Sequence, residues 1–124
     1  MSVKGLGTDI VEIGRIEQAL ASSNRLATRV LTDTEMAIFN GHNQPARYLA
    51  KRWAAKEAAA KALGTGIGRG ISFQHFEISN DALGAPQLQF TGSALELAQQ
   101  RQITSVLLSI SDETHYAMAT VILS

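Results

Sequence analysis

The 124-residue sequence contains no cysteine. This absence excludes a disulfide framework, a thiolate metal site and a cysteine nucleophile, and it fits a reducing compartment. Long apolar runs are also missing, and the first stretch, MSVKGLGTDIVEIGRIE, has no signal-peptide core. We therefore expect a cytoplasmic protein that does not interact with a membrane. Since no repeat, linker or low-complexity tract interrupts the chain, the sequence predicts a single domain over residues 1–124.

Net charge is also missing, but the charges are unevenly distributed. Residues 1–69 hold ten of the eleven lysines and arginines and six of the eleven acidic residues, which leaves this stretch at +4. The remainder carries −4. This asymmetry predicts a basic face for an acidic partner, for phosphate groups or for both, with a surface dipole of no function as the alternative. Nucleic-acid binding is not expected, because the net charge is zero and no aromatic-rich basic strand is present.

The first half of the sequence predicts helices after one short strand over residues 3–9. Apolar residues at helical spacing follow over residues 12–21, and one or two helical turns are expected over 25–31. A capping box of Thr32 and Glu35 predicts a further helix over 33–39. Finally, residues 46–63 are dense in strong helix formers, with Pro45 suited to the first turn and Gly64 to the cap. This segment is predicted to be the long central helix, about 27 Å in length.

The second half predicts strands. We expect two of them over residues 71–78 and 86–90, with a turn at 80–84 between them. A second capping box, Ser93 with Glu96, indicates a helix to about Arg101. Residues 105–111 and 116–123 then form a predicted closing hairpin. The order β-α-α-α-β-β-α-β-β predicts an α+β fold with a largely antiparallel sheet.

No stand-alone catalytic motif is present, whether a P-loop, HExxH or GxSxG. On the predicted long helix, Glu57 and Lys61 are four residues apart, the spacing of an exposed ion pair worth a few tenths of a kcal/mol. Asp9 lies at the predicted end of the first strand, where a turn or cap role is the alternative to a metal-binding role. Two carboxylates with waters and substrate phosphates are the usual ligands of Mg²⁺. The three histidines lack metal-ligand spacing, and none is assigned a catalytic role.

The segment GTGIGRG, residues 64–70, holds four glycines in seven positions. Glycine lets backbone amides approach a ligand closely, and such amides bind phosphate. The end of the preceding helix carries partial negative charge, however, and does not favour an anion. A phosphate at this loop therefore requires cations, which Lys61, Arg69 or a metal ion would supply. A flexible loop without a ligand is the alternative.

Three stretches of the chain resemble the holo-[acyl-carrier-protein] synthases, the short single-domain 4′-phosphopantetheinyl transferases. They are Gly5–Glu17 (GLGTDIVEIGRIE), Arg52–Gly68 (RWAAKEAAAKALGTGIG) and the later pair ISFQHFEI and DALGAP. The resemblance spans nearly the whole chain in the order of the family. It implies the fold of that family and a magnesium-dependent transferase of fatty acid biosynthesis. Such an enzyme moves 4′-phosphopantetheine from coenzyme A to a serine of apo acyl carrier protein and releases adenosine 3′,5′-bisphosphate.

The resemblance also implies roles for individual residues. Asp9 and Glu57 would bind Mg²⁺, and Lys61 would contact the transferred phosphate, which makes these three the catalytic residues. The residues implied to bind coenzyme A are Arg52, Lys61, Gly64, Thr65, Gly66 and Pro86. Those implied to dock the acidic carrier protein are Arg15, Arg25 and Arg29. The family implies a homotrimer with active sites between neighbouring subunits.

One position departs from part of the family. Some relatives carry a histidine in the final hairpin where this chain has Asp112, so a histidine base cannot be carried over. Glu57, directly or through a metal-bound water, is the remaining candidate to accept the proton of the attacking serine. Two alternatives to the enzyme are a module that binds coenzyme A or nucleotides without turnover, and a basic-faced adaptor for an acidic partner.

Overall fold

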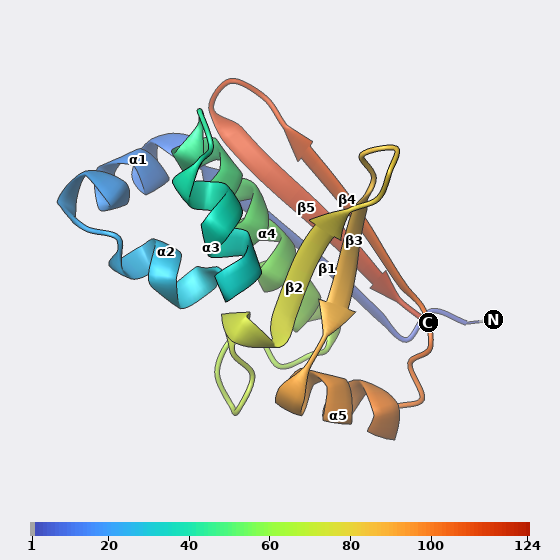
Figure 1. The fold of residues 1–124 in the computed structure, drawn as a ribbon. Helices are drawn as coiled ribbons and strands as arrows, with labels where there is room; N and C mark the ends of the chain where they lie inside the picture. The colour runs from blue at the N-terminus through green and yellow to red at the C-terminus, as the bar shows by residue number, and fades with distance from the viewer. Residues whose placement is uncertain (1) are drawn as a thin grey trace.

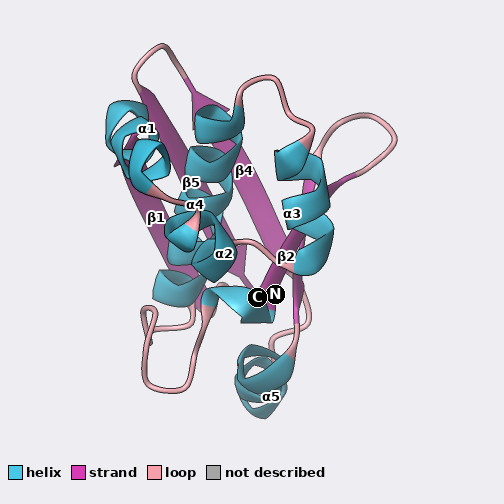
Figure 2. Cartoon of the chain, turned by 60° about the vertical axis from the view of Figure 1, so that its left-hand side comes forward, coloured by secondary structure: helices cyan, strands magenta, loops and turns pink. Residues whose placement is uncertain are grey.

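The computed structural model describes residues 2–124 and places the first four helices on one face of a three-stranded sheet, with the last helix apart from them (Figures 1 and 2). This sheet has the order β1-β5-β4 and is antiparallel. Its strands are β1 (Gly5–Glu12), β4 (Val106–Asp112) and β5 (Tyr116–Leu123). A separate antiparallel pair consists of β2 (Phe76–Asn80) and β3 (Pro86–Phe90). The predicted α+β class, the antiparallel pairing and the closing hairpin are confirmed.

Five α-helices complete the described chain: α1 (Ile13–Ser22), α2 (Arg25–Val30), α3 (Asp33–Asn40), α4 (Pro45–Ala62) and α5 (Gly92–Gln100). The longest, α4, lies across β1 and β5, as predicted for the central helix (Figure 2). Pro45 is in its first turn, and Gly64 follows its end in the left-handed region, with φ of 83°. Because α2 is a helix of its own, four helices precede β2, one more than the predicted order.

Small residues let α4 lie directly on strand β1. A methyl group added at Gly7 would overlap the carbonyl oxygen of Ala58, and one added at Gly5 would overlap that of Ala62. Only glycine permits this approach, because any other residue carries a Cβ atom. The helix contributes a face of fully or nearly fully buried alanines: Ala54, Ala55, Ala58, Ala59 and Ala62. This close contact fixes the position of the β1 residues along and above helix α4, and so determines which side chains of the two elements can meet.

Two predicted boundaries are wrong. β1 continues three residues beyond Asp9, because its pairing with β5 persists to Glu12. The strand predicted over residues 71–78 begins only at Phe76. Before it, Phe73–His75 form a 3-10 turn, η1, whose start is capped by the Ser72 hydroxyl accepting the Gln74 amide hydrogen at 3.0 Å. A local side-chain hydrogen bond of this kind competes with strand formation.

The two predicted capping boxes have different outcomes. The first is confirmed: the hydroxyl of Thr32 accepts from the Glu35 amide, and the Glu35 carboxylate accepts from the Thr32 amide at 2.9 Å. The second is wrong, because α5 begins one residue earlier than Ser93, with Thr91 at its N-cap and no side-chain capping bond. The first residue of α5, Gly92, has a φ of 55°, in the left-handed region that favours glycine.

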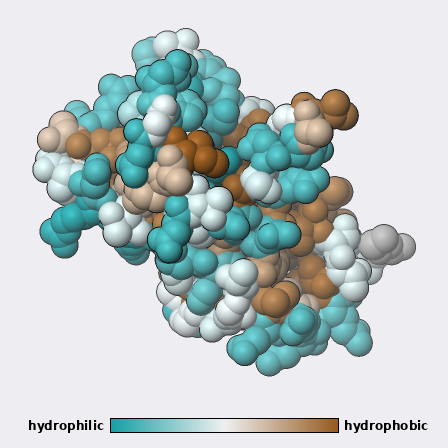
Figure 3. Space-filling model, viewed as in Figure 1, coloured by the Kyte–Doolittle hydropathy of each residue, from teal (hydrophilic) through white to brown (hydrophobic). Residues whose placement is uncertain are grey.

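The other face of the three-stranded sheet is not covered within residues 2–124. Large apolar side chains on it are between 41% and 64% exposed: Leu6, Ile10, Leu107, Tyr116 and Met118. In the space-filling view, brown apolar patches also interrupt the teal polar surface on the side where the strands lie (Figure 3). A soluble monomer rarely exposes a contiguous apolar patch of this kind, so it indicates an interaction surface. Among the described helices, none is long and apolar enough to cross a bilayer.

Candidate active site

Asp9 and Glu57 line the same cavity, although 48 positions separate them in the sequence. The cavity has a volume of about 380 Å³. We call it the carboxylate cavity, and it is lined by Asp9, Ile10, Val11, Glu12, Arg15, Trp53, Glu57 and Lys61. The glycine contacts of β1 produce this meeting, since they hold the strand against the helix that carries Glu57 and Lys61.

Lys61 bonds to the first strand rather than to its own helix. Its Nζ lies 2.9 Å from Asp9 Oδ1 and donates to the carbonyl oxygen of Thr8 at 3.0 Å. The expected ion pair between Glu57 and Lys61 is therefore wrong. Glu57 Oε1 instead accepts a hydrogen bond from Trp53 Nε1 at 3.3 Å. Each carboxylate thus keeps one oxygen without a protein hydrogen-bond donor in the described chain.

Those two oxygens suit a magnesium ion. Mg²⁺ is usually held by one or two carboxylates, completed by waters and substrate phosphates. Asp9 and Glu57 supply that number of carboxylates, and the cavity between them is open to solvent. Over residues 2–124 the structure has no cluster of three or more histidine, cysteine, aspartate or glutamate side chains that would form an all-protein metal cage. The donor set therefore fits an ion whose coordination a substrate completes.

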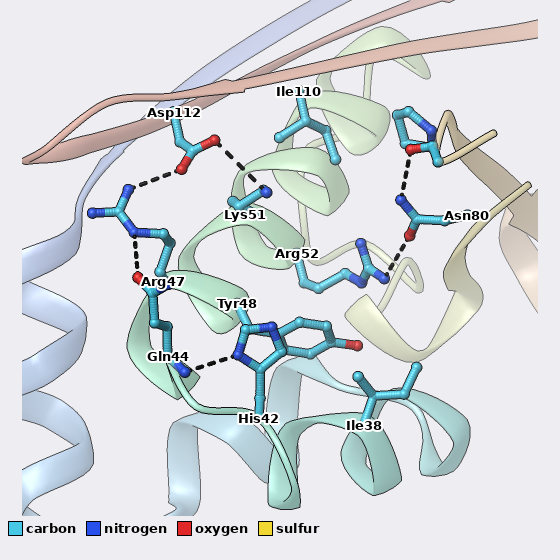
Figure 4. Close-up of a pocket in the computed structure, with 12 residues that line it drawn as sticks. Ile38, His42, Gln44, Arg47, Tyr48, Lys51, Arg52, Asn80, Ile110 and Asp112 are labelled. Carbon is cyan, nitrogen blue, oxygen red and sulfur yellow. Dashed lines mark hydrogen bonds and ion pairs between the residues drawn. The ribbon is translucent and has the colours of Figure 1, made fainter.

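A second and larger cavity, about 590 Å³ in volume, lies beside the first half of α4 (Figure 4). We call it the arginine cavity, and its lining includes Arg47, Tyr48, Lys51, Arg52, Asn80, Pro86 and Asp112. Asp112 bonds to two of the three cations, to Arg47 Nη1 at 2.8 Å and to Lys51 Nζ at 3.7 Å. With three cations and one carboxylate, the cavity favours an anionic ligand.

Arg52 is the least exposed cation of the arginine cavity. Its guanidinium lies 4.8 Å from the centre of the Tyr48 ring and donates weakly to Asn80 Oδ1 at 3.4 Å (Figure 4). Its Nε is buried, lies 3.9 Å from Glu35 Oε2 and has no hydrogen-bond partner in the described structure. Burial raises the pKa of Tyr48, and the neighbouring Arg52 opposes that shift. An arginine left with unused donors at a cavity wall is suited to bind an anion.

Sequence reasoning missed the buried pair behind this arginine. Lys56 and Glu35 are both fully buried, and Lys56 Nζ lies 2.6 Å from Glu35 Oε1. The other oxygen, Oε2, accepts the backbone N–H of Ile78 at 2.8 Å. Burial lowers the pKa of Lys56, and the charge of Glu35 opposes this shift. The capping box identified Glu35 only as a helix cap, and no sequence signal marked its second contact.

The residues predicted to bind coenzyme A do not line a single cavity in this structure. Arg52 and Pro86 line the arginine cavity, and Lys61 lines the carboxylate cavity. The segment Gly64–Gly66 lines neither cavity and lies beyond the end of α4, about 18 Å along the helix axis from Arg52. Its amides are also in use, because those of Gly64, Thr65 and Gly66 bond to carbonyl oxygens of the last helical turn. A phosphate nest built from these three amides is therefore not available in this conformation.

The predicted docking arginines lie on the two helices that follow β1. Arg15, on α1, lines the carboxylate cavity. Arg25 and Arg29 are exposed on α2, and the guanidinium of Arg29 lies 5.3 Å from the centre of the Phe73 ring. No acidic side chain forms an ion pair with any of the three within the described residues. They are available to an acidic partner.

A sequence model of the 4′-phosphopantetheinyl transferase superfamily matches residues 5–121. The chain belongs to this superfamily. The match includes both cavities and the glycine segment after α4. The family resemblance inferred from the motifs is thereby confirmed.

Individual members of the superfamily are similar over almost the whole chain. The holo-[acyl-carrier-protein] synthase of Pseudoalteromonas atlantica is 65% identical over 123 residues, covering 99% of this chain and 98% of that protein. The crystal structure of holo-[acyl-carrier-protein] synthase from Neisseria meningitidis matches with a TM-score of 0.91 at 42% identity, covering 99% of each chain. The Helicobacter pylori synthase in complex with coenzyme A matches at 0.83 and 32% identity, covering 96% of this chain and 99% of that one.

Proposed function

We propose that this chain transfers 4′-phosphopantetheine from coenzyme A to a serine hydroxyl of apo acyl carrier protein. The second product is adenosine 3′,5′-bisphosphate, and the reaction serves fatty acid biosynthesis in the cytoplasm. The similarity to synthases of this name supports the proposal, as does the coenzyme A in the complex of the Helicobacter pylori relative. The observation that carries it is the carboxylate cavity, where Asp9, Glu57 and Lys61 line one opening with a volume of about 380 Å³.

In the proposed reaction, the serine oxygen attacks the β-phosphorus of coenzyme A. A phosphorus–oxygen bond to the serine forms, and the bond between the β-phosphorus and the bridging oxygen breaks, leaving that oxygen on the adenosine bisphosphate. The carboxylate of Glu57 accepts the serine proton. Lys61, half exposed at the cavity, stabilises negative charge on the phosphate oxygens in the transition state.

Asp9 and Glu57 would hold a magnesium ion. When bound, the ion neutralises diphosphate charge and orients the phosphate for in-line attack, as in other phosphoryl transfers. The cations of the arginine cavity, Arg52 above all, bind the remaining anionic part of coenzyme A. Arg15, Arg25 and Arg29 attract the acidic carrier protein towards the mouth of the carboxylate cavity.

A direct mass measurement tests this function. The protein is incubated with apo acyl carrier protein, coenzyme A and Mg²⁺, and the carrier is weighed. We expect a mass gain of one phosphopantetheine that EDTA abolishes. A non-catalytic module would bind coenzyme A without any gain in carrier mass. An adaptor would bind the carrier equally well with or without Mg²⁺ and coenzyme A.

We further propose that the active form is a homotrimer with active sites between neighbouring subunits. The carboxylate cavity and the arginine cavity have no lining residue in common, so within one chain they are separate openings. The uncovered apolar face of the three-stranded sheet offers a surface for a second copy. A partner subunit would bring its arginine cavity to the carboxylate cavity of its neighbour.

Mixing inactive variants tests the shared site. Glu57→Gln removes a residue of the carboxylate cavity, and Arg52→Ala removes one of the arginine cavity. We expect the two inactive preparations to regain transfer when they are unfolded and refolded together, since some interfaces then join two intact halves. Glu57→Gln mixed with Asp9→Asn is the matched control, and this pair should stay inactive. If the first mixture also stays inactive, the site lies within one chain.

A further inference from the structure

The C-terminal end of α2 is held by side chains from distant parts of the sequence. The last carbonyl groups of an α-helix have no partner within the helix. Here the Nε2 of Gln74, on the 3-10 turn η1, lies within hydrogen-bond distance of two carbonyl oxygens of the helix and of the one on its C-cap residue, Leu31, so its two hydrogens are shared among three acceptors. The acceptors are the carbonyl oxygens of Thr28 at 3.3 Å, Arg29 at 3.1 Å and Leu31 at 2.8 Å. The carbonyl oxygen between them, that of Val30, accepts from buried Lys56 at 2.6 Å.

These bonds matter because α2 is only six residues long. Isolated helices of this length are not stable in water, so tertiary contacts must define the conformation and direction of α2. Its N-cap residue, Asn24, makes no side-chain capping bond, and the one side-chain hydrogen bond to its first turn is the long one from the Arg25 amide to the Ser23 hydroxyl, at 3.3 Å. Gln74 therefore supplies most of the side-chain hydrogen bonds that fix the end of this helix.

The residue before Gln74, Phe73, contacts a side chain of the same helix. The buried ring of Phe73 lies under the guanidinium of Arg29, at 5.3 Å. Phe73 and Gln74 thus contact one side chain and the backbone end of α2 from adjacent positions. Arg29, one of the two exposed cations of this helix, therefore contacts a turn that is more than forty residues away in sequence.

We propose that Gln74 is a positioning residue for recognition of the acidic carrier protein, acting through Arg25 and Arg29. This inference rests on the proposed function, in which those arginines dock the carrier. Without the Gln74 amide, the end of α2 would fray and its arginines would sample more conformations. Binding the carrier would then require ordering them, which weakens binding without altering the chemistry at Asp9, Glu57 and Lys61.

The first test is kinetic. Gln74→Met keeps the length of the side chain but removes the donor. We expect the KM for apo acyl carrier protein to rise about three- to tenfold, while kcat and the KM for coenzyme A stay within about twofold. Gln99→Met, an exposed glutamine on α5 without a side-chain hydrogen bond in the described structure, is the matched control and should leave every parameter unchanged. An unchanged KM for the carrier in Gln74→Met would overturn the proposal.

A double-mutant cycle separates positioning from a general loss of structure. If Gln74 acts through the arginines, Gln74→Met should raise the KM for the carrier much less in an Arg25→Ala/Arg29→Ala background than in the wild type. Independent, multiplicative effects would sink the proposal, as would a double-arginine variant with unchanged KM. Gln74→Lys restores a donor of similar length, and we expect its KM to return to the wild-type value or below. Thermal unfolding of each variant confirms that the measured protein is folded.

The outcome is distinguishable from failure of the proposed function. If the wild-type protein adds no mass to the carrier, the function itself is wrong. If the wild type is active and the Gln74 variants have the same KM for the carrier as the wild type, the function stands and the positioning role falls. The carrier can be varied as well as the enzyme. For carrier proteins with fewer acidic residues, Gln74→Met should raise the KM less than it does for an acidic carrier.

Discussion

Helix α4 contributes charged residues to two groups in opposite environments. The buried group is Lys56 with Glu35, and the exposed group is Glu57 and Lys61 with Asp9. Lys56 is fully buried and pairs with Glu35, whereas Glu57 faces the carboxylate cavity and keeps a free oxygen. The buried group joins α3, α4 and β2, and its charges satisfy one another. The exposed group leaves its charges available to a ligand. The comparison shows that charge in the buried group determines structure, while charge in the exposed group is kept for chemistry.

The largest expected effect comes from the exposed group. Glu57→Gln keeps the shape of the side chain but removes a charge and the proton acceptor. We expect transfer to fall by about 10²–10⁴-fold, with little change in the free energy of unfolding. Both are measured on the same preparation, by carrier mass and by urea unfolding. Near-normal magnesium-dependent transfer in this variant would contradict the role of Glu57.

The buried group should respond through stability. Lys56→Met leaves Glu35 charged, buried and without its main partner, so we expect a loss of about 3–5 kcal/mol in the free energy of unfolding. Lys61→Met is the matched control, since it removes a half-exposed lysine from the same helix and should cost at most about 1 kcal/mol. Urea unfolding measures both. Equal losses in the two variants would show that the contrast between the groups is wrong.

The close contact of β1 with α4 can be tested by a single methyl group. Gly7→Ala would place its Cβ on the carbonyl oxygen of Ala58, so we expect a loss of about 1–3 kcal/mol and reduced transfer as Asp9 shifts. Gly14→Ala, on α1, has open space around the new Cβ. It should stabilise the protein by about 0.5–1 kcal/mol. A neutral Gly7→Ala would mean that the strand can move away from the helix without cost.

The smallest effect concerns Tyr48, which lies between the arginine cavity and the buried group. Because burial raises its pKa above the ordinary value of a phenol, the folded state retains the proton at a pH where the unfolded state loses it. Stability contributed by this group is therefore complete below the pKa of the unfolded phenol, about 10, and is lost as the pH rises through the folded value. Urea unfolding at pH 9 and pH 11 should show a smaller alkaline loss for Tyr48→Phe than for the wild type.

The sequence predicted those features that local patterns determine. Helix formers between Pro45 and Gly64 predicted α4, and Thr32 with Glu35 predicted the start of α3. The structure places Asp9 and Glu57 in one cavity, as the family resemblance implied. No pattern in the sequence itself linked these two residues. Their roles as metal ligands and the homotrimer stay predictions.

Failures arose where a residue makes a tertiary contact that its neighbours do not signal. Lys61 has the spacing of an ion pair with Glu57, yet Asp9 lies closer because the glycines of β1 bring the strand to the helix. Lys56 reads as an exposed lysine on a helix, yet Glu35 from another helix permits its burial. The 3-10 turn at Phe73 was missed because its residues also fit a strand.

Trp53 is the only tryptophan in the sequence, and its indole N–H donates to Glu57 in the wall of the carboxylate cavity. The tryptophan fluorescence of this protein therefore originates from one known position, adjacent to a proposed metal ligand. A change in the partner of Glu57 should shift or quench that emission, without a dye or a coupled assay. The active-site wall thus contains its own optical reporter, by which the order of metal, coenzyme A and carrier binding can be followed in a stopped-flow instrument.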